Sequence, residues 1–325
     1  MARMRVLIRL SALLLAASVI SLAAAQPYPA KPVRLIVPFP AGGPADIFGR
    51  FLAQGMGAQL GQPVVVENVS GMSGALGVDR AAKSPADGYT LAIISSSAAS
   101  IGPFAMANMP FDPGKDLTLI STAVRVPEVI AVNPSLPVNT LAELIDFLKA
   151  NPGKVNYGSA GPGSITHLGA ELLKVETHTD ALHVPYKGAA PAVNDLLGGQ
   201  VQFGIFDVPV LLPHIRAGKL RALAITSGKR AATLPEVPTT GELGYPKVNS
   251  DNWYGLVGPA GLPPAILKRI GAAASAALNS PEVSEQYAKV GGVPMPSTPE
   301  EFAVYLAQDQ AKWGAVVKAI GFKAE

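Results

Sequence analysis

The chain has 325 residues, 49% of them hydrophobic, and contains no cysteine, so it can form neither a disulfide nor a thiolate metal site. It carries 26 basic and 23 acidic residues, but three of the arginines lie within the first nine positions. Beyond residue 25 the two signs balance, which leaves no basic surplus of the kind that nucleic-acid binding requires. A chain of this length and apolar content can bury a core, and two lobes are favoured over one.

The first 25 residues have the features of a secretory signal peptide. After a basic start, residues 10–22 form an apolar stretch that is too short to span a bilayer comfortably. Ala23-Ala24-Ala25 then offers a cleavage site of small residues. We therefore predict cleavage after Ala25 and export to the periplasm, with an uncleaved membrane anchor as the alternative.

The first predicted unit joins a strand to a helix through a glycine turn. Residues 33–37 predict a strand, and residues 47–60 predict an amphipathic helix. The intervening PFPAGGPAD places Pro44 where a first-turn proline belongs. The first N–H groups of a helix have no intrahelical partner and carry partial positive charge, so this turn can bind an anion. Gly42 and Gly43 lack a Cβ and would let a ligand approach the backbone; a plain connecting turn is the alternative interpretation.

The same arrangement occurs a second time. Residues 155–158 predict a strand, SAGPGS follows at 159–164, and residues 165–175 predict a helix. The repetition favours a binding role for both glycine turns.

The remaining segments alternate strands with helices, which predicts mostly parallel sheets with helices on their faces. Residues 102–127 are rich in proline and predict no regular element. The last helix begins at a capping box formed by Thr298 and Glu301, and Thr140 with Glu143 forms another. Strands are predicted at residues 64–68, 89–94, 129–132, 183–186, 201–206, 220–225 and 253–257. Helices are predicted at residues 190–197, 208–216, 263–278 and 298–320, and two more begin at about residue 73 and at residue 140.

Several long motifs occur in order along the chain: YPAKPVRLIVPFPAGGPAD, QPVVVENVSGMSGALG, SPADGYTL, KVNYGSAGPGSITHL, HVPYKGAAPAVNDLLGGQV, HIRAGKLRALAIT and PTTGELGYP…WYGLVGP. In these motifs the chain resembles the Bug (TctC-like) receptors, the extracytoplasmic solute-binding components of tripartite tricarboxylate transporters. The resemblance implies an α/β, two-lobed periplasmic-binding-protein fold of type II, with a mostly parallel sheet in each lobe. It also implies a discontinuous first lobe, residues 26–127 with 252–325, and a second lobe of residues 128–251. One departure is Val69, where many relatives have arginine.

The resemblance implies that a carboxylate lies between two facing loops, residues 41–46 and 159–164, which are the two glycine turns. The predicted ligand-binding residues are Phe39, Ala41, Gly42, Gly43, Asp46, Ser96, Ser159, Gly163, Ser164, His167 and Asp207.

Four of these residues also have a structural interpretation. Asp46 would repel a carboxylate and could instead stabilise the helix start. Ser164 could serve only as a helix cap, and Asp207 could cap the helix that follows it. A lone histidine such as His167 is more often structural.

These features predict a periplasmic receptor that captures a small organic carboxylate by lobe closure, with di- or tricarboxylates favoured. The resemblance implies delivery to the membrane permease subunits of a tripartite tricarboxylate transporter. The histidines lack zinc spacing, no G-x-S-x-G occurs, and neither glycine loop matches a nucleotide motif. We therefore predict no catalytic residue, metal, cofactor or nucleic-acid partner, and a monomer. An exported α/β hydrolase or transferase, using the loops as an oxyanion or phosphate site, is the alternative.

Overall fold

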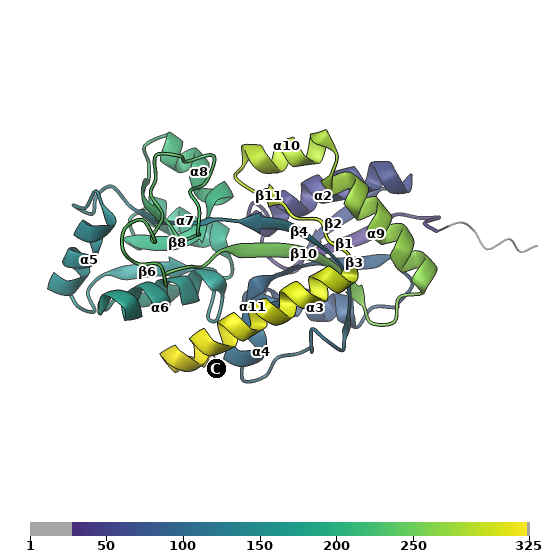
Figure 1. The fold of residues 1–325 in the computed structure, drawn as a ribbon, viewed down its shortest axis with the longest axis horizontal. Helices are drawn as coiled ribbons and strands as arrows, with labels where there is room; N and C mark the ends of the chain where they lie inside the picture. The colour runs from purple at the N-terminus through teal and green to yellow at the C-terminus, as the bar shows by residue number, and fades with distance from the viewer. Residues whose placement is uncertain (1–27, 324–325) are drawn as a thin grey trace, which may run out of the picture.

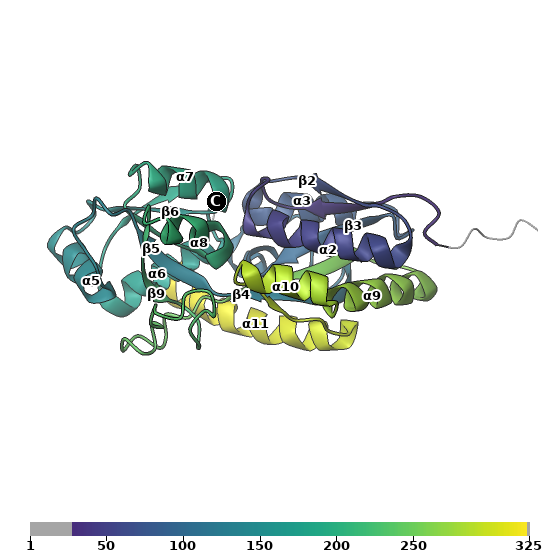
Figure 2. The same cartoon turned by 90° about the horizontal axis from the view of Figure 1, so that it is seen from above.

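The computed structural model describes residues 28–323, which form two β-sheets flanked by helices and lying end to end along the longest axis (Figures 1 and 2). The predicted signal peptide lies outside the described residues. The first sheet has the strand order β11-β4-β10-β3-β1-β2, and the second has the order β7-β6-β8-β5-β9. The strands are β1 (Val33–Val37), β2 (Val64–Asn68), β3 (Thr90–Ser95), β4 (Leu117–Val126), β5 (Glu128–Val132), β6 (Asn156–Ser159), β7 (Leu182–Pro185), β8 (Phe203–Asp207), β9 (Arg221–Ile225), β10 (Asn252–Pro259) and β11 (Val293–Pro294).

The helices pack on both faces of each sheet, because alternate strand residues belong to different cores. Leu35 packs with α2 and α9, whereas its neighbour Ile36 packs with α3 and α11. In the second sheet Val129 packs with α7 and α8, and Ile130 packs with α5 and α6. The helical segments are α2 (Pro44–Leu60), η1 (Met72–Gly74), α3 (Ala75–Ala82), η2 (Ser97–Ile101), α4 (Gly102–Ala105), α5 (Leu141–Ala150), α6 (Ile165–Thr177), α7 (Ala189–Leu197), α8 (Val208–Arg216), α9 (Pro264–Leu278), α10 (Pro281–Lys289) and α11 (Pro299–Ile320).

The predicted two-sheet α/β architecture is confirmed, but both sheets are mixed rather than mostly parallel. β1 runs parallel to β2 and β3, and β6 runs parallel to β7 and β8. By contrast, β10 is antiparallel to β3 and β4, and β5 is antiparallel to β8 and β9. The cause is the path of the chain: β4 leaves the first sheet directly into β5, and β10 returns beside β4, so the two neighbours must run in opposite directions.

Three segments connect the two sheets. β4 passes through Pro127 into β5, and the chain returns through Asp251 into β10, where Asn252 pairs with Val126. The third connection is α11, which crosses from the first sheet to α6 (Figure 1). Its Trp313 and Val317 pack there with Leu168 and Leu172 of α6.

The polar interruption in the apolar stripe of α11 also has a structural role. Asp309 accepts a hydrogen bond of 2.7 Å from Trp253 Nε1, and Gln310 donates one of 2.8 Å to the carbonyl of Ala99. The predicted capping box at Thr298 and Glu301 is confirmed. At Thr140 the hydroxyl caps its helix as predicted, but the Glu143 carboxylate accepts from the N–H of Asn139 rather than from that of Thr140.

Several elements were not predicted from sequence, η2 and α4 among them. β4 lies inside residues 102–127, where Thr118, Ser121 and Thr122 break the apolar pattern but bond to neighbouring segments through their side chains or backbone. The helix α10 and the two-residue strand β11 were also missed. The helix expected from Ser73 begins at Ala75, because Met72 and Ser73 have positive φ in the preceding turn.

In the described part of the chain, no helix is long and apolar enough to cross a membrane.

We expect Gly77→Ala to lower the free energy of unfolding by about 1–3 kcal/mol. Gly77 lies on α3, where an added Cβ would be 2.5 Å from the Val69 carbonyl oxygen and 2.8 Å from Pro38 Cα. Backbone atoms cannot rotate away, so the helix would have to shift. Gly271→Ala on α9 is the matched control: its Cβ would meet nothing within 4 Å, and better helix propensity should add about 0.5–1 kcal/mol. Equal denaturant midpoints for the two variants would contradict the expectation.

Candidate functional site

The first glycine loop joins β1 to α2 as predicted. Gly42 has a φ of +79°, a conformation that favours glycine. Gly43 is the N-cap residue and has no side chain to cap the first turn, and Pro44 is the first residue of α2. The N–H of Ala45 therefore has no acceptor among the residues that the structure describes. This helix start keeps a free backbone donor.

Asp46 bonds to three groups of the protein and is not among the residues that line the cavity described below. Its Oδ2 accepts from the Gly42 N–H at 3.0 Å and from Arg50 Nε at 2.9 Å, and its Oδ1 accepts from Asn68 Nδ2 at 2.9 Å. Burial opposes ionisation, but these bonds outweigh it and hold the pKa of Asp46 below its usual range. The structural interpretation of Asp46 fits this geometry.

The second glycine loop joins β6 to α6, and its polar groups bond largely to one another. The Thr166 hydroxyl accepts from the Ala160 N–H at 2.8 Å, and His167 Nδ1 accepts from the Gly163 N–H at 3.2 Å. Ser164 caps α6 by accepting from the N–H of His167. In the part of the chain described, the N–H of Thr166 finds no acceptor. The second helix start thus also keeps a free donor.

The His167 side chain is buried against two other rings. Its ring stacks on that of His183 with centroids 3.9 Å apart, and Phe322 meets it edge-on at 4.7 Å. Burial lowers the pKa of His167 to about 3 and that of His183 to about 4, so both rings are neutral at periplasmic pH. His183 Nε2 lies 2.6 Å from the Ser159 hydroxyl, which ties β7 to the loop.

Residues of both loops line one small cavity, and the second loop also bonds to η1 and η2 of the first half of the molecule. Ser73 Oγ donates to the Pro162 carbonyl at 2.8 Å, and Ser97 Oγ accepts from the Ile165 N–H at 3.1 Å. Each contact joins residues of different sheets, so this is a closed arrangement. The cavity is lined by Phe39, Gly43, Pro44, Ser97, Ala160, Ile165, Thr166, Ala189, Asp207, Asn252 and Tyr254.

A hydrogen-bonded trio lies at the inner end of the cavity. Tyr254 donates to Asp207 Oδ2 at 2.6 Å, and Asn252 Nδ2 donates to Asp207 Oδ1 at 3.1 Å. Ser96 Oγ donates to Asn252 Oδ1 at 2.7 Å. Burial raises the pKa of Asp207 to about 7, although the bonds from Tyr254 and Asn252 oppose the rise. Asp207 is therefore poised between its two protonation states near neutral pH.

Of the predicted site residues, Phe39, Gly43 and Asp207 line the cavity. The others form the shell around it: they shape the loops, cap a helix or, like Ser96, support a lining residue. Val69 is partly buried against the core that includes α3 and brings no charge to the cavity. Ser97 lies at the strand end, residues 95–97, where contacts with the cavity are expected. The prediction did not include Thr166, which adjoins His167, or Asn252 and Tyr254, which the return path of the chain brings to the site.

The cavity offers donors and one carboxyl but no metal cluster. Among the described residues no group of three or more metal-ligating side chains occurs. The cavity is lined by the starts of α2 and α6, by the Ser97 and Thr166 side chains, and by Asp207. This set suits hydrogen bonding to a small polar anion.

The comparisons with known proteins agree with this geometry. The profile of the tripartite tricarboxylate transporter family receptor, TctC, matches residues 48–322. The protein BugT of Bordetella pertussis is 42% identical over 300 residues, which cover 92% of this chain and 92% of BugT. The solved structure of the periplasmic binding protein BugD is 33% identical with a TM-score of 0.88, covering 92% of this chain and 100% of that one. The R. palustris protein Rpa4515, solved with adipate, is 33% identical with a TM-score of 0.89, covering 91% and 99%.

With a family match over most of its length and relatives that cover it almost fully, the chain belongs to the TctC (Bug) receptors of tripartite tricarboxylate transporters, and it is a periplasmic solute-binding protein, not an enzyme.

Proposed function

We propose that the chain binds a small organic dicarboxylate between its two glycine loops and delivers it to the membrane subunits of a tripartite tricarboxylate transporter. One observation carries the proposal: two helix starts, Gly43–Pro44 beside the first sheet and Ile165–Thr166 beside the second, line one cavity. At these starts the N–H groups of Ala45 and Thr166 have no acceptor among the described residues. Each helix start can hold one carboxylate. The adipate in the structure of Rpa4515, itself a dicarboxylate, supports this ligand class.

In this proposal the lobes are residues 26–127 with 252–325, and residues 128–251. They rotate about the two strand connections at Pro127 and Asp251. The contacts between Ser73 and Pro162 and between Ser97 and Ile165 form only when the lobes are closed. A ligand that bridges both helix starts favours that state by its differential affinity for it.

The proposal also assigns a role to Asp207. An ionised Asp207 would repel a second carboxylate in the cavity, but it accepts hydrogen bonds from hydroxyl or ammonium groups. A ligand with such a substituent between its carboxylates would satisfy both helix starts and Asp207. We therefore expect hydroxy- or amino-substituted dicarboxylates to bind more tightly than the unsubstituted acids at pH 8.

The test measures binding and shape together. We expect a dicarboxylate from a panel that includes adipate to raise the melting temperature and to reduce the radius of gyration in solution scattering. A monocarboxylate of the same length should bind far more weakly and close the lobes less, since it reaches only one helix start. The salt dependence should be weak, because the donors are neutral. The proposal fails if scattering curves with and without a saturating dicarboxylate superimpose.

A further inference from the structure

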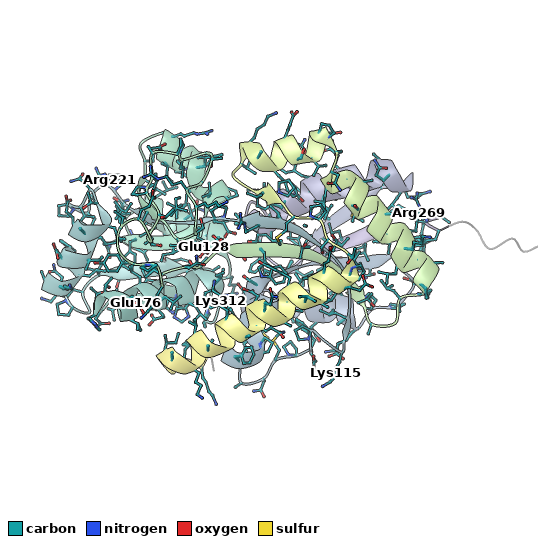
Figure 3. All side chains as sticks on the ribbon, in the orientation of Figure 1. Lys115, Glu128, Glu176, Arg221, Arg269 and Lys312 are labelled. Carbon is teal, nitrogen blue, oxygen red and sulfur yellow. The ribbon has the colours of Figure 1, made fainter. Side chains whose placement is uncertain are left out.

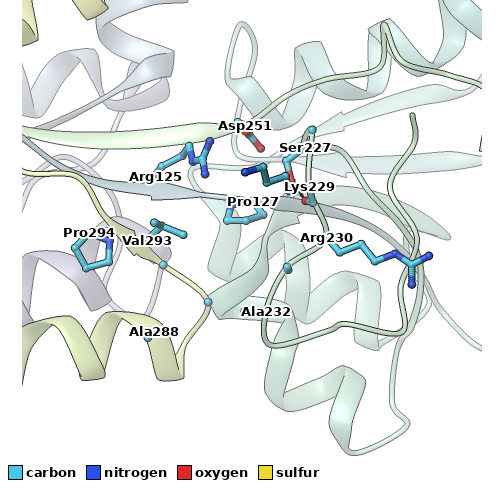
Figure 4. Close-up of a pocket in the computed structure, with 14 residues that line it drawn as sticks. Arg125, Pro127, Ser227, Lys229, Arg230, Ala232, Asp251, Ala288, Val293 and Pro294 are labelled. Atoms are coloured by element: carbon cyan, nitrogen blue, oxygen red, sulfur yellow. Dashed lines mark hydrogen bonds between the residues drawn. The ribbon is translucent and has the colours of Figure 1, made fainter. Parts of the chain in front are cut away.

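A second hollow lies across the connecting strands from the ligand cavity. This groove has a volume of about 510 Å³ and includes Pro127, Ser227, Ala232 and Val293 in its walls (Figure 4). In the first sheet, β3 and β1 lie on one side of β4 and β10, and β11 lies on the other. In the second sheet, β6 and β8 lie on one side of β5, and β9 lies on the other. The glycine loops follow β1 and β6, whereas the groove lies beside β11 and the segment after β9, so it is distinct from the ligand cavity.

Three charged side chains gather in this groove. Figure 4 shows the cationic ends of Arg125 and Lys229 and the carboxylate of Asp251 turned toward one another. Within residues 28–323, neither Arg125 nor Lys229 has an acidic partner, whereas the nearby Arg230 is bonded to Glu242 at 3.0 Å. Two cations are thus available beside one carboxylate.

Asp251 is the hydrogen-bond acceptor of this group and lines the groove. Its Oδ1 is inaccessible to solvent and has no hydrogen-bond donor among the described residues. The nearby Ser227 hydroxyl donates to the Lys229 carbonyl instead. A buried acceptor without a donor costs about 1–3 kcal/mol. Burial raises the pKa of Asp251 to about 6, with Arg125 and Lys312 opposing the rise, so the carboxyl is ionised at pH 8 and can accept a proton-bearing group.

We propose that this groove is a second ligand site, for a small anion that carries its own hydrogen-bond donor. The anionic oxygens contact Arg125 and Lys229, and the donor meets the carboxylate of Asp251, which lines the groove. Pro127, Val293 and Pro294 form an apolar wall that leaves room for an organic body attached to the anionic group. The ligand class is thus the oxyanions that also carry an O–H group, such as monohydrogen phosphate and the anions of hydroxy acids.

Inorganic phosphate and sulfate are the probes, because at pH 8 both are dianions of similar size but only phosphate retains a proton. We expect calorimetry to show phosphate binding to the full mature protein at least ~10-fold more tightly than sulfate. Arg125→Gln with Lys229→Gln should weaken phosphate binding at least ~10-fold. Lys149→Gln with Lys219→Gln, at two exposed lysines outside the groove, is the charge-matched control and should leave binding unchanged.

Asp251→Asn tests whether the carboxylate of Asp251 is what distinguishes phosphate from sulfate. An amide can donate to sulfate, so this variant should bring the affinities for the two anions within a factor of about three. Melting curves confirm that each variant is folded. Absence of phosphate binding in the millimolar range, equal binding of phosphate and sulfate to the unaltered protein, or equal effects of the groove and control variants would overturn the proposal.

Discussion

At pH 8, Glu128→Gln should raise the free energy of unfolding by at least about 2 kcal/mol, because it removes a buried carboxyl whose ionisation the folded state disfavours. Glu128 begins β5 at the junction of the two halves of the molecule (Figure 3). The residue is fully buried, and neither carboxyl oxygen has a hydrogen-bond partner among the described residues. Burial, and then the charge of Asp207 directly opposite on β8, raise the pKa of Glu128 well above its usual range.

The raised pKa values fix the direction of the pH dependence. In the unfolded chain both carboxyls titrate near pH 4, whereas folded Asp207 titrates at about 7. Between these values the folded state binds more protons than the unfolded state. The stability contributed by this pair is therefore fully present below about pH 4 and is lost as the pH rises through about 7. The glutamine side chain of the variant stays neutral and only Asp207 is left to titrate, so Glu128→Gln should lose less stability between pH 5 and pH 8 than the unaltered protein does.

Urea unfolding at several pH values would measure both effects. Glu236→Gln is the matched control, since Glu236 is exposed and should change stability by less than about 0.5 kcal/mol. A variant that is less stable than the original protein at pH 8, or that keeps the full decline between pH 5 and pH 8, would show that Glu128 is not a buried destabilising acid.

The two glycine loops could be predicted because each depends only on residues that are neighbours in the sequence. A strand that ends in glycines followed by Pro44, or by Ser164 at a helix cap, determines where free N–H groups lie. The same local reasoning could not separate residues that face the cavity from residues that hold the loop. The structural interpretations of Asp46 and His167 rest on their contacts with Asn68 and His183, which are distant in the sequence.

The features that depend on the path of the chain were less predictable. β4 carries hydroxyl side chains whose partners come from residues 259 and 295–297, so its burial leaves no apolar alternation in the sequence. β10 pairs antiparallel with β4 because the chain returns from the second sheet to the first, and no residue pattern in the sequence predicts that return. Asn252 and Tyr254 reach the cavity through that crossing, which is why the residues bonded to Asp207 were missed as a site.

Ala160→Trp should reduce the affinity for the dicarboxylate at least ~100-fold, which corresponds to about 2.8 kcal/mol. Ala160 follows β6 in the second glycine loop, is buried, and lines the cavity with Phe39 and Gly43 of the opposite loop. An indole there would occupy the space between the helix starts. It would also hold the loops apart, so the contact from Ser73 to Pro162 could not form. Binding and closure are linked, and both should be lost together.

Calorimetry and solution scattering on the same samples would test this linkage. Without ligand, the Ala160→Trp variant should have a radius of gyration at least as large as that of the unaltered protein, and adding dicarboxylate should not reduce it. Ala217→Trp, at an exposed position just after α8, is the control for adding an indole and should bind and close normally. A variant that binds weakly yet still closes would separate the two processes and contradict closure by a bridging ligand. Normal affinity in Ala160→Trp would place the ligand elsewhere, because no dicarboxylate can share this small cavity with an indole.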